Sequence, residues 1–109
     1  MSNGMPDAPW DVSYIDRVNL FARLLVLDAR ALRRGIRGAY QDALRIIEEQ
    51  LLQNPLGWGD PVYEAKQAGY TRRHGSQPPL HAYYAVHEES RCVWVQDILA
   101  VPGWGLDED

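Results

Sequence analysis

Apolar residues recur every three or four positions in the first half of the chain, which is the spacing of one face of an α-helix. The first stripe consists of Leu20, Leu24, Leu27 and Ala31. A glycine inside a helix costs about 1 kcal/mol relative to alanine. The pattern therefore predicts a helix that ends in a tight turn near Gly35.

A second apolar stripe follows directly. Its members have the same helical spacing and are Ile36, Tyr40, Ala43, Leu44, Ile47 and Leu51. The Asn54-Pro55 pair is expected to end this helix, because proline pushes the residue before it out of the helical region. Two antiparallel helices that each bury one apolar face are the simplest arrangement of these stripes.

Outside the helices the apolar positions alternate, which is the pattern of a half-buried β-strand. Residues 10–14 alternate in this way and predict a short strand ahead of the first helix. Residues 80–86 and 92–96 alternate on either side of a polar turn at residues 88–91. Two alternating runs joined by a polar turn predict an antiparallel hairpin.

Between the second helix and this hairpin the chain is rich in glycine and proline. Residues 57–61 are predicted to form a turn. A strand is expected to begin at Val62, and residues 69–74 either continue it or flank it. Residues 75–79 are expected to form a loop.

The order of these elements predicts an α+β fold: an N-terminal strand, a two-helix hairpin and then a three-stranded antiparallel meander. The helices are expected to cover one face of the sheet because their apolar stripes need a partner, which leaves the other face open. Alternation assigns His81, Tyr83 and Trp94 to one face, and Tyr84 and Val93 to the other. Aromatic side chains on an open face would mark a binding surface.

A chain of 109 residues is long enough for one hydrophobic core, so a single domain is expected. The elements above place this domain at residues 10–101. Residues 1–9 are rich in proline and small polar residues and are expected to be a disordered N-terminal segment. Residues 102–109 are expected to form an acidic C-terminal tail.

Composition and charge limit the classes of function. The formal net charge is -4, which argues against a chain that binds nucleic acid through overall positive charge. No apolar run reaches the roughly 20 residues of a membrane span, and the first residues lack the features of a signal peptide. The single Cys92 fits a reducing compartment. A cytoplasmic protein without membrane association is therefore expected.

The sequence carries no motif for a bound metal or cofactor. It has no paired-cysteine spacing, no glycine-rich phosphate loop and no nucleophile elbow. His81 and His87 lie on one predicted strand, about 20 Å apart, and are not expected to bind the same ion. Neither a cofactor nor a metal is therefore expected.

Basic and aromatic residues gather instead around the predicted 75–79 loop. They are Lys66, Tyr70, Arg72, Arg73, His74 and His81. Arginine can stabilise the charge of a phosphorane-like transition state, and histidine or tyrosine can move protons during attack by a ribose 2′-hydroxyl. This set is a candidate for metal-free ribonuclease chemistry, and the alternative is a solvated basic loop.

Three short segments resemble a known family. LLQNP at residues 51–55 looks like the end of its second helix, LHAYYAV at residues 80–86 like its third strand, and RCVWVQDI at residues 91–98 like its fourth. In these segments, and in the order of its elements, the chain resembles the RelE/ParE superfamily of type II toxin-antitoxin toxins. The resemblance implies a small bacterial toxin that cleaves messenger RNA on the ribosome or poisons DNA gyrase, and that an antitoxin holds inactive.

The resemblance also bears on single residues. Ribosome-dependent members often carry an arginine where the third strand begins, and this chain has His81 there. Lys66 matches a position on the second strand that is often basic. Together with Arg72 and Arg73, these residues are the predicted catalytic set. The partners that the resemblance implies are a cognate antitoxin and either the ribosome with its messenger RNA or DNA gyrase.

The chain departs from the family at its C-terminal end. Members commonly have a basic, histidine-bearing segment after the fourth strand, whereas this chain continues into the acidic residues 102–109. Two functions therefore stay open. One is a toxin-like endoribonuclease that needs no metal. The other is a non-catalytic protein-binding module of the same fold, gyrase-directed or degenerate, for which Trp58, Trp94 and Trp104 are the candidate anchors.

Overall fold

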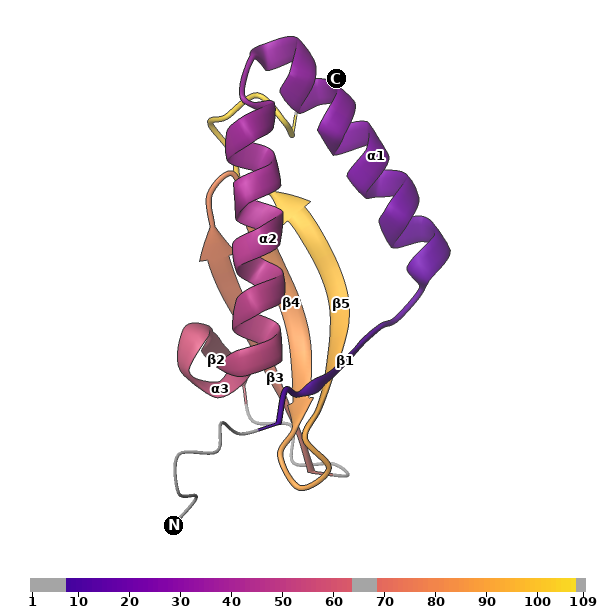
Figure 1. Cartoon of the computed structure of the whole chain (residues 1–109), viewed down its shortest axis with the longest axis vertical. Helices are drawn as coiled ribbons and strands as arrows, with labels where there is room; N and C mark the ends of the chain where they lie inside the picture. The colour runs from indigo at the N-terminus through magenta and orange to yellow at the C-terminus, as the bar shows by residue number, and fades with distance from the viewer. Residues whose placement is uncertain (1–7, 64–68, 108–109) are drawn as a thin grey trace.

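The computed structural model describes residues 8–63 and 69–107 (Figure 1). The predicted catalytic residue Lys66 and most of the predicted N-terminal segment lie outside these residues. In chain order, the elements are β1 (Asp11–Tyr14), α1 (Arg17–Arg34), α2 (Arg37–Gln53), α3 (Pro55–Trp58), β2 (Asp60–Tyr63), β3 (Tyr70–Gln77), β4 (Leu80–His87) and β5 (Cys92–Ala100).

The strands form one mixed sheet in the order β1-β5-β4-β3-β2. β1 runs parallel to β5, and the other neighbouring strands are antiparallel. The predicted α+β fold, a strand followed by two helices and antiparallel strands, is confirmed. Between the second helix and Leu80 the sequence predicts one strand, whereas the structure has two, β2 and β3, which pair with each other.

The two long helices meet at the turn between them and diverge from there on one face of the sheet, with α2 over β3 and β4 and α1 against β5 (Figure 1). Gly35 ends α1 as predicted. Its φ of 75° is left-handed, which glycine adopts without steric cost, and its N–H reaches the carbonyl groups of Ala31 and Leu32. The turn between the helices therefore depends on this glycine.

The second helix ends at Gln53, just ahead of the Asn54-Pro55 pair that predicted its end. Pro55 then opens the short helix α3, which takes up the first two residues of the predicted 57–61 turn, while the last two belong to β2. Proline is tolerated at the first helical position because its missing N–H has no partner there. The hydroxyl group of Tyr84 donates to the Pro55 carbonyl at 2.8 Å, so α3 is tied to the middle of β4.

β3 is longer than predicted. Tyr70–Gln77 pairs with Leu80–His87 at eight successive positions, so only two prolines connect the strands. The loop predicted at residues 75–79 is therefore wrong over its first three residues. The glycine that suggested a loop, Gly75, instead gives space to the ring of Trp58 above the strand.

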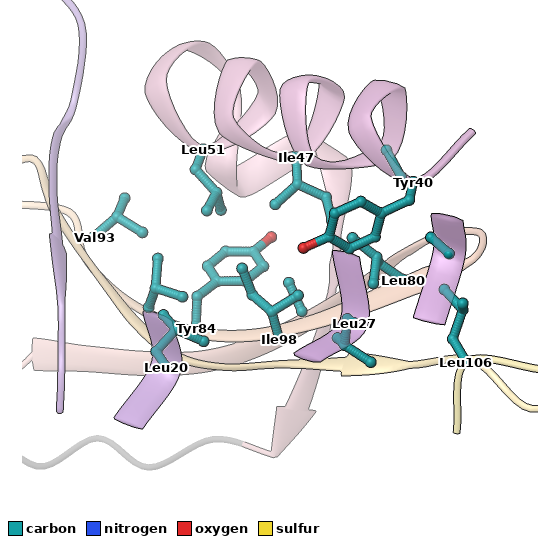
Figure 2. Close-up of a cluster of buried hydrophobic side chains, with 14 of the residues drawn as sticks. Leu20, Leu27, Tyr40, Ile47, Leu51, Leu80, Tyr84, Val93, Ile98 and Leu106 are labelled. Atoms are coloured by element: carbon teal, nitrogen blue, oxygen red, sulfur yellow. The ribbon is translucent and has the colours of Figure 1, made fainter. Parts of the chain in front are cut away.

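The core fills the space between the helices and one face of the sheet (Figure 2). Its fully buried members include Ile47, Leu51, Leu80, Tyr84, Val86, Val93 and Val95. The predicted division of the strand residues is confirmed, because Tyr84 and Val93 are buried in this core while His81, Tyr83 and Trp94 stay half-exposed. The second face of the sheet therefore lies away from the helices.

The segment that follows β5 returns to α1. Leu106 is 0% exposed and belongs to the core (Figure 2). Arg30 donates to the Leu106 carbonyl at 2.8 Å, and Gly105 lies against the side chain of Arg34. The sequence predicts that the tail begins at residue 102, and the structure holds residues 102–107 against the domain through Leu106.

Across residues 8–63 and 69–107, no helix combines the length and the apolarity that a bilayer crossing needs.

Candidate functional site

One face of the sheet carries large polar and aromatic side chains. Residues that lie directly opposite each other in an antiparallel pair point to the same side, so the strand register decides which side chains share this face. We call this surface the open face, and its residues are Tyr70, Arg72, His74, His81, Tyr83, Ala85, His87 and Trp94. It holds most of the aromatic and basic residues that the sequence singles out.

A pair of histidines lies at one end of the open face. His74 on β3 and His81 on β4 approach each other with 3.0 Å between Nδ1 of His74 and Nε2 of His81. Tyr83 adjoins both rings, at centroid distances of 6.0 Å from His74 and 5.0 Å from His81. The two imidazoles therefore share one hydrogen bond, and one ring accepts while the other donates.

The pair also has an electrostatic consequence. Burial lowers the pKa of His81, and the neighbouring His74 lowers it further. A positive charge on both rings at this separation is unfavourable, because like charges in contact repel. His81 is therefore poised to act as a neutral imidazole, which can accept a proton or bind a cation through its lone pair.

Aromatic side chains make up the other end of the open face. Nε1 of Trp94 donates to the Tyr70 hydroxyl group at 3.1 Å, and the Tyr70 ring lies 4.9 Å from that of His87. The backbone N–H of Ser90 donates to Nδ1 of His87 at 3.2 Å, which fixes this ring beside the β4–β5 turn. These contacts hold three rings in place on adjacent strands.

Arg72 lies between the two ends. It stands opposite Ala85, which in turn stands opposite Trp94. Ala85 is buried even though it points away from the core, so its larger neighbours cover it. A small residue at this position leaves room for the guanidinium group and the indole ring in one row across three strands.

Arg73 has a different environment from Arg72. It stands opposite Tyr84, which puts it on the helix side of the sheet. Its guanidinium group donates to the carbonyl oxygens of Leu56, at 2.7 Å, and Gly59. Arg73 therefore holds α3 and the chain after it against β3, away from the open face.

The structure brings together only part of the predicted catalytic set. Arg72 and His81 share the open face, but His81 lies four positions along β4 from Ala85, the residue opposite Arg72. At about 3.3 Å per residue, this is a distance of roughly 13 Å along the strand. Arg73 points to the other side, and Lys66 lies outside the described residues.

The contact between His74 and His81 is the feature that sequence reasoning missed. Sequence reasoning groups both residues among the basic and aromatic set without pairing them. The signal was available, because a turn centred on Pro78 and Pro79 places residue 74 opposite residue 83 and diagonal to residue 81. Placing a five-residue loop at residues 75–79 hides that register.

A second exposed feature lies on α1. Val18, Leu25 and Leu32 are spaced seven residues apart and are 78%, 72% and 62% exposed. Seven residues are about two helical turns, so these side chains form a line along the helix. Phe21 adjoins the line and is exposed as well. We call these four residues the α1 stripe.

The α1 stripe borders a groove between the two long helices. The groove has a volume of about 500 Å³, and its lining includes Phe21, Leu24 and Leu25 of α1 with Tyr40 and Leu44 of α2. It is mainly apolar, so a side chain that fills it would gain through burial of apolar surface.

Ligand sites of other kinds find less support. Among the described residues, no group of three or more histidine, cysteine or carboxylate side chains is arranged to hold a metal ion.

Comparison of the chain with protein-family models, with curated proteins and with solved structures gives no match.

Proposed function

We propose that this chain is the toxin-like member of a type II toxin-antitoxin pair, with a RelE/ParE-like fold and with its partner bound along α1. The order of elements, one strand, two helices and antiparallel strands, is what that family would have. The α1 stripe is the observation that carries the partner-binding part of the proposal.

The α1 stripe is unusual for a helix that also has a buried face. Leu20, Leu27 and Ala31 already supply the side of α1 that packs on the sheet. A second apolar line on the same helix has no role in the core of this chain, and exposed apolar patches commonly mark interaction sites. Seven-residue spacing is the pattern that a second helix can pack against.

Charge indicates the chemistry of the partner. α1 contains five arginines, Arg17, Arg23, Arg30, Arg33 and Arg34, and one aspartate, Asp28. Arg23 pairs with Asp97 of β5, so part of this positive charge is already neutralised within the fold. Asp28 forms an ion pair with Arg37 at 3.0 Å, which reduces its effect on an incoming segment. An acidic amphipathic helix, such as an antitoxin segment, would complement this surface, whereas a second copy of α1 would place arginines beside arginines.

The test uses the product of the reading frame next to the gene as the candidate antitoxin. Co-expression with the wild-type chain, followed by size-exclusion chromatography with light scattering, is expected to give a stable complex. Leu25→Asp places a charge in the middle of the α1 stripe and is expected to weaken binding roughly tenfold or more. Leu52→Asp, at an exposed apolar position of α2, is the matched control and is expected to bind like the wild type.

Two results would contradict this proposal. One is that the neighbouring product does not bind. The other is that the wild-type chain dimerises alone and Leu25→Asp abolishes the dimer, which would make a second copy the occupant of the α1 stripe.

Cleavage of RNA is a second candidate function, and the open face is the observation that favours it. Rings on adjacent strands offer stacking surfaces for unpaired bases, and Arg72 between them offers a positive charge for a phosphate group. His81 remains the candidate for proton transfer. The open face thus has groups for binding a single strand, although the chain as a whole is acidic.

Two measurements test this second function. One is growth arrest on expression of the chain, and the other is cleavage of translated messenger RNA, with the cleavage sites mapped by primer extension. Arg72→Ala is expected to abolish cleavage while the complex with the antitoxin still forms, because the open face and the α1 stripe lie on different surfaces. If the wild-type chain neither arrests growth nor cleaves RNA on ribosomes, the catalytic function is excluded and the partner-binding function is judged on its own test.

A further inference from the structure

The contact between His74 and His81 provides two imidazole nitrogens on neighbouring strands. Nδ1 of His74 and Nε2 of His81 are 3.0 Å apart, and the ring planes are inclined by 45°. The residues are diagonal neighbours, because His74 stands opposite Tyr83 and His81 opposite Ser76. Their separation therefore depends on the strand register and not on a flexible loop.

This separation suits a metal ion as well as a proton. A nitrogen ligand lies about 2.1 Å from a first-row transition-metal ion. Two such ligands are about 3.0 Å apart when the angle at the metal is near 90°, and about 3.4 Å apart in a tetrahedral site. The observed 3.0 Å between the nitrogens matches the first geometry.

In the observed hydrogen bond the lone pair of the accepting ring points at the other nitrogen, so both rings must turn, by roughly 45° for a 90° site, before their lone pairs meet at one ion. Torsion about χ2 of histidine is broad, so such a rotation is inexpensive. The Tyr83 ring stacks near His74, with an interplanar angle of 18°, and meets His81 edge-on, so it lies beside both imidazoles. The site is therefore held by paired strands and flanked by an aromatic wall.

We propose that His74 and His81 form a two-histidine chelating site for a first-row transition-metal cation that accepts ligands at 90°, with Cu²⁺ and Ni²⁺ as the best fits. Water completes the coordination, since no third histidine, cysteine or carboxylate of the described residues joins the pair. The site goes beyond the proposed partner binding along α1, and it shares His81 with the candidate ribonuclease function.

The test is isothermal titration calorimetry of the full-length, tag-free chain with Ni²⁺ and, separately, with Cu²⁺. The buffer must not bind metal ions. One ion per chain is expected. His74→Ala and His81→Ala are each expected to weaken binding roughly tenfold or more. His87→Ala is the matched control, because His87 lies on the same face of β4 but contacts Tyr70 and Ser90 and not the pair.

A second measurement distinguishes lost metal binding from poor folding of a variant. A ligand that binds the folded state raises the midpoint of thermal unfolding, so Ni²⁺ is expected to stabilise the wild type and His87→Ala but not His81→Ala. For the Cu²⁺ complex, electron paramagnetic resonance is expected to show coupling to two nitrogen nuclei.

Two outcomes would overturn the site. One is that the wild type binds these ions no more tightly than the His74→Ala/His81→Ala double variant, in which case the pair shares only a proton. The other is that His87→Ala loses as much affinity as His81→Ala, in which case the ion binds elsewhere on the chain.

Discussion

The ring of Trp58 lies against the backbone of Gly75, where an added Cβ atom would come within 2.6 Å of the ring. The same ring stacks on Tyr84 with centroids 5.8 Å apart. Trp58, on α3, therefore packs between the buried tyrosine of β4 and a strand position that only glycine can occupy without displacement. This relationship explains the position of α3, and it holds Trp58 against the core with its side chain only partly buried.

Gly75→Ala is accordingly expected to destabilise the fold. The added methyl group must push the Trp58 ring away from Tyr84, and overpacking of this kind costs about 1–3 kcal/mol. Urea denaturation gives the free energy of unfolding. Gly38→Ala is the matched control: it lies in α2 with nothing within 4 Å of the added atom, so it is expected to stabilise by about 0.5–1 kcal/mol. Equal effects of the two substitutions would show that the Trp58 contact is not tight.

Arg73→Ala is expected to reduce stability rather than remove a catalytic group. The substitution deletes the bonds from the guanidinium group to the carbonyl oxygens of Leu56 and Gly59, at a cost of about 1–3 kcal/mol. Arg45→Ala, which breaks an exposed ion pair with Glu49 on α2, is the matched control and is expected to leave the free energy of unfolding almost unchanged, because water screens an exposed ion pair.

Growth assays with the Arg73 variant follow from the same reasoning. If Arg73→Ala relieves growth arrest, the relief is expected to track the amount of folded protein and to diminish at lower temperature. A fully stable Arg73→Ala chain that has lost activity would instead place Arg73 in the catalytic site.

Stability is expected to fall at alkaline pH through Tyr40. Burial, with a smaller effect of Asp28, raises the pKa of Tyr40 from 10.0 to about 12, and its hydroxyl group donates to the Leu24 carbonyl at 2.8 Å. Below pH 10 both folded and unfolded states keep the proton. Between pH 10 and 12 the unfolded state releases it while the folded state retains it, so the free energy of unfolding decreases.

Tyr40→Phe tests this pH dependence. It is expected to lose about 1 kcal/mol at neutral pH through the missing hydrogen bond and to show a shallower decrease above pH 10. Part of the decrease remains, because burial also raises the pKa of Tyr14 and Tyr84. Chemical denaturation from pH 8 to pH 11.5 compares the two chains, and parallel curves would contradict the assignment to Tyr40.

Leu106→Ala is expected to cost about 2–4 kcal/mol, because it leaves a cavity under α1 at the end of the core. The adjacent Asp107 is exposed, and Asp107→Ala is expected to change stability by about 0.5 kcal/mol or less. Thermal unfolding distinguishes the two variants. A Leu106→Ala chain as stable as the wild type would mean that the segment after β5 contributes nothing to the fold.

Sequence reasoning succeeds where structure depends on neighbours along the chain. The helical stripes, the turn near Gly35 and the end of α2 at Asn54-Pro55 are predicted because spacing and backbone preference act within a few residues. The β4–β5 hairpin is predicted for the same reason, and so is the division of its residues between a core face and an open face.

The candidate site is predicted only in part. The sequence groups Arg72, Arg73, His74 and His81 together. Residues that are adjacent in a strand point to opposite sides, and the structure puts Arg73 on the other side of the sheet from Arg72. The alternation signal is weak around residues 69–77, where glycine and polar residues leave no apolar face to read. The faces of β3 become clear only from its pairing with β4.

Spacing, breakers and alternation in the chain alone determine two amphipathic helices, an antiparallel hairpin and the α+β class. Tertiary structure alone decides that β1 joins β5 in parallel, that Trp58 packs on Gly75, that Leu106 closes the core and that His74 meets His81. The physical reason is the range of the interactions. Backbone preference and periodicity act over a few residues, whereas packing and strand register join residues that the sequence holds far apart.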